Sequence, residues 1–229
     1  MDNLGENMRK KKHCITFCFV FIFITYNSIF GQDLCHKVIK QNVSINARAT
    51  DIESVLQAIS FVTPVPIGFE SSAVNGAIEK VDLTISNQPV DFILNGIIKQ
   101  LRSYKWDCHE GVINIYPITG SNKLFDVKVK ELKVENVLDK DLGMVILGLP
   151  EIASEINELQ LKVKLKKEKT YSLKTVVASP NIKPPIITVS FQSNTFREIL
   201  NKLLKEYGVI YWSLIINSKD KTIYLSLKY

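Results

Sequence analysis

The sequence predicts an α+β protein made of two tandem βαββαββ modules, each with two helices packed on short mixed sheets. Residues 81–106 align without a gap with residues 187–212, at a constant offset of 106 positions. The apolar positions of the two segments coincide, Asn95 falls on Asn201, and each segment ends in a tryptophan. Because the same tryptophan closes the same apolar pattern, we interpret the segments as copies of one duplicated supersecondary unit.

The first 31 residues have the order of a secretory signal peptide. Four basic residues at 9–12 precede a mostly apolar stretch at 13–30, and Gly31 supplies a small residue for cleavage. A retained membrane anchor is the alternative, although about 18 apolar residues fall short of the roughly 20 that usually span a bilayer. We therefore expect an exported chain, periplasmic or associated with the outer membrane, which touches a membrane only through an uncleaved N-terminal segment.

The charge of the remaining chain is modest. Without residues 1–31 it keeps 25 basic and 21 acidic residues, which leaves a net charge of +4. A charge this small does not favour nucleic acid as a partner. The remaining length, about 200 residues, is enough to bury a core in two small domains.

Two cysteines, Cys35 and Cys108, remain after residues 1–31, and each is followed by a histidine. An even number of cysteines in an oxidising compartment favours a disulfide between them. Zinc binding together with His36 and His109 is an alternative. It is disfavoured because neighbouring residues of a strand point to opposite faces and do not easily share one metal. Free or intermolecular thiols are the third possibility.

The first module, residues 38–118, is predicted to open with a strand, a helix and a second strand. Residues 43–47 alternate in hydropathy, as a strand does. Thr50 and Glu53 have the spacing of a capping box, which predicts that Thr50 caps the helix. Apolar residues then recur at helical spacing until a proline ends the helix, and the apolar run at 65–70 predicts the next strand.

The second half of the first module contains the repeated segment. Alternation at 81–86 predicts a strand. Pro89 is placed in the first helical turn, where its missing N–H costs nothing, and an apolar stripe extends the helix to about Arg102. The module closes with a hairpin that turns at Glu110 and Gly111.

The second module, residues 124–229, is predicted to begin with a strand at 125–132 and a helix at 138–149 that Pro150 ends. Apolar residues then alternate with lysines and glutamine over 159–165. This alternation predicts a two-faced strand within a lysine-rich hairpin at about 159–177, a segment that the first module lacks.

The closing half of the second module repeats the first. Residues 187–191 are expected to form a strand, and Thr195 with Glu198 gives a second capping-box pattern before the matching helix. Gly208 is expected to stop this helix in a left-handed conformation. A final hairpin then turns across residues 217–221.

The segment 81–94 reads Val-Asp-Leu-Thr-Ile-Ser-Asn-Gln-Pro-Val-Asp-Phe-Ile-Leu and is followed by a helix and an aromatic hairpin. With the preceding strand and helix, it resembles the secretin and TonB short N-terminal (STN) domain. The resemblance covers residues 38–118 and the last forty residues well, and the start of the second module loosely. It implies a small α/β sandwich of the bacterial periplasm that contacts proteins and catalyses nothing. No barrel strands or plug follow the modules, so we do not expect the chain itself to be a receptor or secretin.

Two features are candidates for binding. The first is a row of lysines: Lys162, Lys164, Lys166, Lys167 and Lys169. The row either meets an anionic glycan, lipid head group or acidic protein, or protects an edge strand from aggregation. The second is an aromatic group made of Trp106, Trp212, Tyr104, Tyr211 and Tyr224, which either forms an exposed binding face or packs in the core.

The sequence has no nucleophile elbow, Walker loop or dinucleotide-binding glycine pattern. We therefore expect a non-enzymatic interaction or adaptor module of the cell envelope, without metal or cofactor. Its expected partner is an envelope protein such as a receptor, secretin or regulator. The alternatives are a module that binds glycan, peptidoglycan or another anionic ligand, and a small hydrolase that uses Cys108 and His109.

Overall fold

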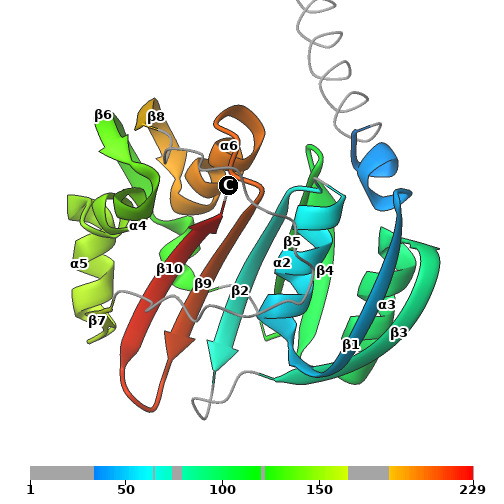
Figure 1. Ribbon diagram of the computed structural model, residues 1–229. Helices are drawn as coiled ribbons and strands as arrows, with labels where there is room; N and C mark the ends of the chain where they lie inside the picture. Colours follow the sequence, from blue (N-terminus) through cyan, green and yellow to red (C-terminus); the bar gives the residue numbers. More distant parts are fainter. Residues whose placement is uncertain (1–33, 64, 74–78, 120–121, 165–185, 229) are drawn as a thin grey trace, which may run out of the picture.

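The computed structural model describes residues 34–63, 65–73, 79–119, 122–164 and 186–228. Within these residues the protein has the predicted α+β class, with helices packed on small mixed sheets (Figure 1). The expected signal peptide at 1–31 lies outside the described residues. Residues 34–39 form a short helical segment ahead of the first strand.

The first module has the predicted order βαββαββ. Its elements are β1 (Asn42–Asp51), α2 (Ile52–Val62), β2 (Ile67–Ala73), β3 (Lys80–Pro89), α3 (Val90–Gln100), β4 (Tyr104–His109) and β5 (Val112–Pro117). Strands β1 and β3 pair antiparallel, β4 and β5 form the predicted hairpin, and β2 lies parallel to β5. Their apolar residues and those of α2 and α3 form one buried core.

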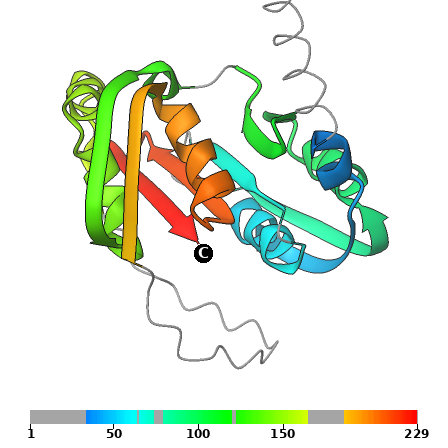
Figure 2. The same cartoon turned by 90° about the horizontal axis from the view of Figure 1, so that it is seen from above.

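The second module repeats this order with two additional elements, a 3-10 helix at its start and a second α-helix after α4. Its elements are η1 (Lys123–Asp126), β6 (Lys128–Leu138), α4 (Asp139–Leu147), α5 (Pro150–Glu158), β7 (Lys162–Val163), β8 (Ile186–Thr195), α6 (Phe196–Glu206), β9 (Tyr211–Asn217) and β10 (Thr222–Lys228). Strands β6 and β8 pair antiparallel, α6 lies beside β8 and contacts β9, and α4 contacts β10 (Figure 2).

One six-stranded sheet runs through both modules. Its described strands follow the order β4-β5-β2-β9-β10-β7, so the two modules meet where β2 lies beside β9. The outermost strands are β4 at one end and β7 at the other. The position of these two edges matters because a sheet edge presents backbone groups to other chains.

The helix caps show where local patterns succeed and fail. The predicted box at Thr195 and Glu198 is confirmed, with both reciprocal hydrogen bonds present. The prediction of Thr50 as the cap of α2 is wrong. Strand β1 extends through Thr50 to Asp51, and the Asp51 side chain accepts the hydrogen bond from the Ser54 N–H. Aspartate is at least as good a cap as threonine, so the cap lies one residue later than predicted, and the strand expected at 43–47 continues to Asp51.

The turns of the repeated unit follow the predictions. Glu110 and Gly111 both have positive φ, as a tight two-residue hairpin requires. Gly208 also has positive φ, +72°, and directly follows Tyr207, the residue that caps the end of α6. The helix predicted to reach Arg102 ends at Gln100.

The start of the second module departs most from the predictions. Phe125 lies in the 3-10 helix η1 rather than in a strand, and α4 ends at Leu147. Pro150 then occupies the first turn of a helix, α5, that was not predicted. Of the predicted hairpin at 159–177, the part from 165 onward lies outside the described residues, so the hairpin stays a prediction. The observed β7 pairs parallel with β10, just as β2 pairs parallel with β5 in the first module.

Candidate functional site at the edges of the sheet

The seam between the modules is a parallel strand pair inside the sheet. Strands β2 and β9 stay in register over seven residues, from Ile67 beside Tyr211 to Ala73 beside Asn217. Tyr211 belongs to the second module's strand but is buried in the first module's core. Burial raises the pKa of the Tyr211 hydroxyl well above its ordinary value. The two modules are therefore joined by shared backbone pairing and by shared core packing.

Polar side chains also cross the seam. The Ser213 hydroxyl of β9 donates a 2.7 Å hydrogen bond to Glu53 of α2, and both residues are buried. Arg197 of α6 lies 3.1 Å from the carboxylate of Glu70, which is only 3% exposed on its side chain. The Arg197 guanidinium also lies 4.3 Å from the centre of the Phe125 ring. Removing one partner of a buried charge pair is costly. The contacts of Glu53 and Glu70 with residues of the second module therefore help to hold the two modules together at the seam.

The repeated asparagine and tryptophan make the same contact in both modules. In the first, Trp106 Nε1 donates to Asn95 Oδ1 at 3.1 Å, and in the second, Trp212 Nε1 donates to Asn201 Oδ1 at 3.1 Å. Each bond holds the indole of the first hairpin strand against the preceding helix. The two rings therefore have the same place relative to their own helix.

The two tryptophans differ in what lies beside them. Trp212 is 0% exposed and its ring covers Gly68 of β2. A Cβ atom on Gly68 would lie 2.7 Å from Trp212 Nε1 and closer still to two ring carbons. Trp106 is only half-buried, and its strand β4 pairs with β5 alone among the described strands. At the seam, β2 thus occupies the position beside Trp212, whereas none of the described strands occupies the equivalent position beside Trp106.

The other aromatic residues do not form an exposed binding face. Tyr104 and Tyr211 are buried, and Tyr224 is half-buried. Core packing is therefore the role of most of this group, as one of the two interpretations predicted. Trp106 and Tyr224 remain partly accessible, and of the two Trp106 lies on the edge strand β4.

The solvent face of β4 is polar and charged. Lys105, Asp107 and His109 are exposed, and they alternate with Tyr104, Trp106 and Cys108. Asp107 accepts a 2.6 Å hydrogen bond from the Tyr116 hydroxyl, and this bond raises the pKa of Tyr116 to about 12. Trp106 is therefore preceded on the edge strand by a positive side chain, Lys105, and followed by a negative one, Asp107.

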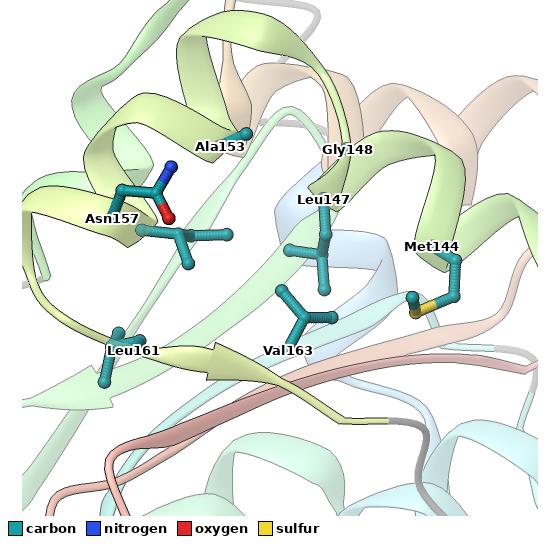
Figure 3. Close-up of a pocket in the computed structure, with 8 residues that line it drawn as sticks. Met144, Leu147, Gly148, Ala153, Asn157, Leu161 and Val163 are labelled. Carbon is teal, nitrogen blue, oxygen red and sulfur yellow. The ribbon is translucent and has the colours of Figure 1, made fainter.

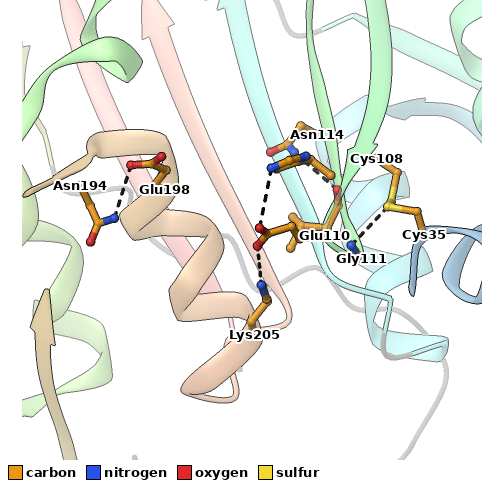
Figure 4. Close-up of polar contacts among 10 residues, drawn as sticks. Cys35, Cys108, Glu110, Gly111, Asn114, Asn194, Glu198 and Lys205 are labelled. Carbon is orange, nitrogen blue, oxygen red and sulfur yellow. Dashed lines mark hydrogen bonds and ion pairs between the residues drawn. A yellow bond between two sulfur atoms is a disulfide. The ribbon is translucent and has the colours of Figure 1, made fainter. Parts of the chain in front are cut away.

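The turn of the β4–β5 hairpin is tied to both modules (Figure 4). Glu110 accepts a 2.6 Å ion-paired hydrogen bond from Lys205 of α6. This hydrogen bond lowers the pKa of the Glu110 carboxyl below its ordinary value. The predicted disulfide between Cys35 and Cys108 is present, with a Cα–Cα distance of 5.8 Å, and the Gly111 N–H donates to the Cys35 sulfur.

The disulfide bears on two of the alternatives considered from the sequence. A cysteine in a disulfide offers no thiolate for catalysis or for zinc, which removes Cys108 as the nucleophile of a hydrolase in this state. The described part of the chain also contains no group of three or more histidine, cysteine or acidic residues placed to hold a metal ion.

The lysine row is only partly within the described residues. Lys162 and Lys164 are both exposed, and they flank Val163 at the β7 edge of the sheet. Lys166, Lys167 and Lys169 lie outside the described residues, so a five-lysine patch stays a prediction. The described pair occupies the position at which lysines protect an edge strand from pairing.

A hollow lies between α4, α5 and β7 (Figure 3). It has a volume of about 250 Å³ and is lined by Met144, Leu147, Gly148, Ala153, Ile156, Asn157, Leu161 and Val163. Asn157 carries the only polar side chain of this lining. Specific ligand sites combine an apolar wall with several convergent polar groups, and this hollow does not.

No protein-family model matches the chain, and no curated protein is significantly similar to it. Among the residues that the structure describes, none of the helices is both long and apolar enough to cross a membrane.

Proposed function

We propose that this chain is an exported, non-enzymatic interaction module that holds a partner protein of the cell envelope at the β4 edge of its sheet. One observation carries the proposal: β4 and β9 are the same strand of the repeat, and among the described strands β9 is paired on both sides whereas β4 is paired on one. An extended segment that adds to an exposed edge gains main-chain hydrogen bonds, which is a common mode of peptide recognition.

Two further features support an envelope role. The order βαββαββ agrees with the STN resemblance, whose members contact other proteins in the periplasm. The disulfide between Cys35 and Cys108 fits an oxidising compartment. Under this proposal the partner is a receptor, a secretin or a regulator, and the chain acts as an adaptor.

Site-specific photocrosslinking in intact cells tests the proposal. A photoreactive amino acid replaces Lys105 on β4, and matched variants carry it at Glu158 at the end of α5 or at Lys162 on β7. All three residues are exposed. We expect a discrete protein adduct from the Lys105 variant alone. No adduct from any variant, or the same adducts from all three, would contradict a partner at the β4 edge.

The second candidate function is binding of an anionic glycan or peptidoglycan fragment at the β7 edge. The exposed pair Lys162 and Lys164 is the observation that favours it. Replacing both by glutamate should abolish sedimentation of the protein with isolated peptidoglycan and leave its circular dichroism unchanged. Undiminished sedimentation would remove this candidate.

A further inference from the structure

We infer that the strand bound at the β4 edge runs parallel to β4 and carries a glycine opposite Trp106. This inference rests on the proposed function and adds the orientation of the partner strand and its central residue. The partner it describes is a protein with an exposed extended segment of that pattern.

The orientation follows from the seam. Strand β9 corresponds to β4, and the strand on its outer side, β2, is parallel to it in all seven paired residues. The pairing is backbone to backbone: the Ile67 N–H donates to the Ile210 carbonyl at 3.2 Å. The same side of β4 faces no strand among those described.

The backbone of β4 is set for such pairing. The Ile118 N–H donates to the Ser103 carbonyl at 2.9 Å, so Ser103 faces β5 through its backbone. In an antiparallel pair alternate residues face the partner strand, which turns the Lys105 and Asp107 backbones toward β5 and the Trp106 backbone outward. A partner strand would therefore form its main-chain hydrogen bonds with the backbone N–H and C=O of Trp106.

The glycine follows from the tryptophan ring. Trp212 covers β2 so closely that Gly68 has no room for a side chain, and Gly68 is the residue directly beside Trp212 in the register. Trp106 is held by Asn95 in the way that Asn201 holds Trp212. A strand that pairs with the outer side of β4 therefore meets the Trp106 indole in the position that the Trp212 indole has beside β2. A side chain at the residue opposite Trp106 would collide with that ring.

The residues on either side of this glycine have a different environment from those at the seam. They would lie beside Lys105 and Asp107 on the exposed face of β4. Opposite charges across a strand pair stabilise it and like charges destabilise it. The matching partner strand therefore has an acidic residue beside Lys105 and a basic residue beside Asp107.

A synthetic peptide with the sequence Thr-Val-Glu-Gly-Lys-Val-Thr is the probe for the full chain. When it runs parallel to β4, it places glutamate beside Lys105, glycine beside Trp106 and lysine beside Asp107. One control peptide has valine in place of the glycine. The other exchanges the glutamate and the lysine, so that its charges match only in the antiparallel direction.

Tryptophan fluorescence gives the readout, because the chain has two tryptophans and Trp212 is fully buried. Acrylamide quenching therefore reports mainly on Trp106. We expect the glycine peptide to protect Trp106 and the valine peptide to bind about tenfold more weakly or worse. We also expect the charge-exchanged peptide to bind more weakly than the first.

The outcomes separate the inference from the proposed function. Equal binding of the glycine and valine peptides, stronger binding of the charge-exchanged peptide, or no protection of Trp106 by any peptide would overturn the inference. If the Lys105 photocrosslink to an envelope protein persists in such a case, the proposed function stands without it. If that crosslink is also absent, both fail.

Discussion

Strands β4 and β9 are copies of one strand and have opposite fates. Both follow the repeated helix, and both carry the tryptophan whose indole nitrogen is bound by an asparagine of that helix. On the outer side of β9 lies β2 of the first module, and the tryptophan of β9 is wholly buried. In β4 the outer side is unpaired among the described strands and the tryptophan is half-buried. The pairing of β9 with β2 is therefore a template, within the same chain, for the kind of strand that the β4 edge can bind.

The largest expected difference between the two strands is in the cost of losing the tryptophan. Trp212→Ala removes a ring that packs on Gly68 and on Phe125, so we expect a loss of up to about 5 kcal/mol in the free energy of unfolding. Trp106→Ala removes a half-buried ring at an edge, and we expect less than half of that loss. Urea denaturation of the two variants measures both values. Equal losses would contradict the difference in packing.

The disulfide is the next largest contribution and is particular to β4. Cys108 aligns with Leu214 in the repeat, which is held by packing alone in a buried position. The Cys35–Cys108 bond closes a loop with a sequence separation of 73, so replacing both cysteines by serine should lower the free energy of unfolding by about 4 kcal/mol.

Reduction provides the control for the disulfide prediction. Dithiothreitol should destabilise the natural chain by a similar amount and leave the double serine variant unchanged. If the natural chain were indifferent to the reductant, the bond would not contribute to stability.

Gly68 tests how tightly the seam is packed. Gly68→Val places a side chain against the Trp212 ring, and we expect a loss of about 3 kcal/mol in the free energy of unfolding. Gly96→Ala is the matched control, because a Cβ at Gly96 meets only Leu83 at 3.8 Å, an ordinary contact. Gly96 lies within a helix, so this control should stabilise the protein by roughly 0.5–1 kcal/mol. If Gly68→Val left the free energy of unfolding unchanged, the strand position beside Trp212 would have room for a side chain, and the inference of a glycine opposite Trp106 would be weakened.

The smallest expected effect is at the ion pair between Lys205 and Glu110. The pKa of Glu110 is lower in the folded protein than its ordinary value of 4.5, chiefly because Lys205 donates a hydrogen bond to it. A carboxyl of this kind stabilises the fold above its unfolded pKa and loses that contribution as the pH falls through the folded pKa. The pair is exposed to solvent, so Lys205→Met should cost only a few tenths of a kcal/mol at pH 7.

The pH dependence identifies the origin of that small effect. The difference between Lys205→Met and the natural chain should shrink as the pH falls below 4.5, and it should vanish once the pH lies below the lowered pKa of Glu110 in the folded protein. Lys99→Met changes the equivalent exposed residue of α3 and should show no such dependence. A Lys205→Met difference that does not shrink as the pH is lowered would point to lost packing instead of lost charge pairing.

The sequence predicted the local structure better than the site. The repeat, the order of elements, the turn at Glu110 and Gly111, and the cap at Thr195 all depend on residues near in sequence, and the structure has them. The cap at Thr50 failed because Asp51 competes for the same role. Helix α5 was missed because Pro150 was interpreted as an end, although proline also suits the first turn of a helix.

The candidate site depends on contacts that no local pattern records. Nothing near Ile67 or Tyr211 indicates that β2 and β9 pair across more than 140 positions. The lysine row can be identified in the sequence itself, whereas the β4 edge can be identified only from the order of strands in the sheet. The repeated pair of asparagine and tryptophan was the available clue, since equal residues in unequal surroundings mark the position where the copies differ.

Amide hydrogen exchange at the two tryptophans tests the central claim most directly. The Trp212 backbone N–H lies within the seam and should exchange at the slow rate of the sheet interior. The Trp106 backbone N–H should exchange fast in the free protein and slow by at least about tenfold when the glycine peptide is bound. If the Trp106 amide of the free protein were already as protected from exchange as the Trp212 amide, the claim that the outer side of β4 is unpaired would be contradicted.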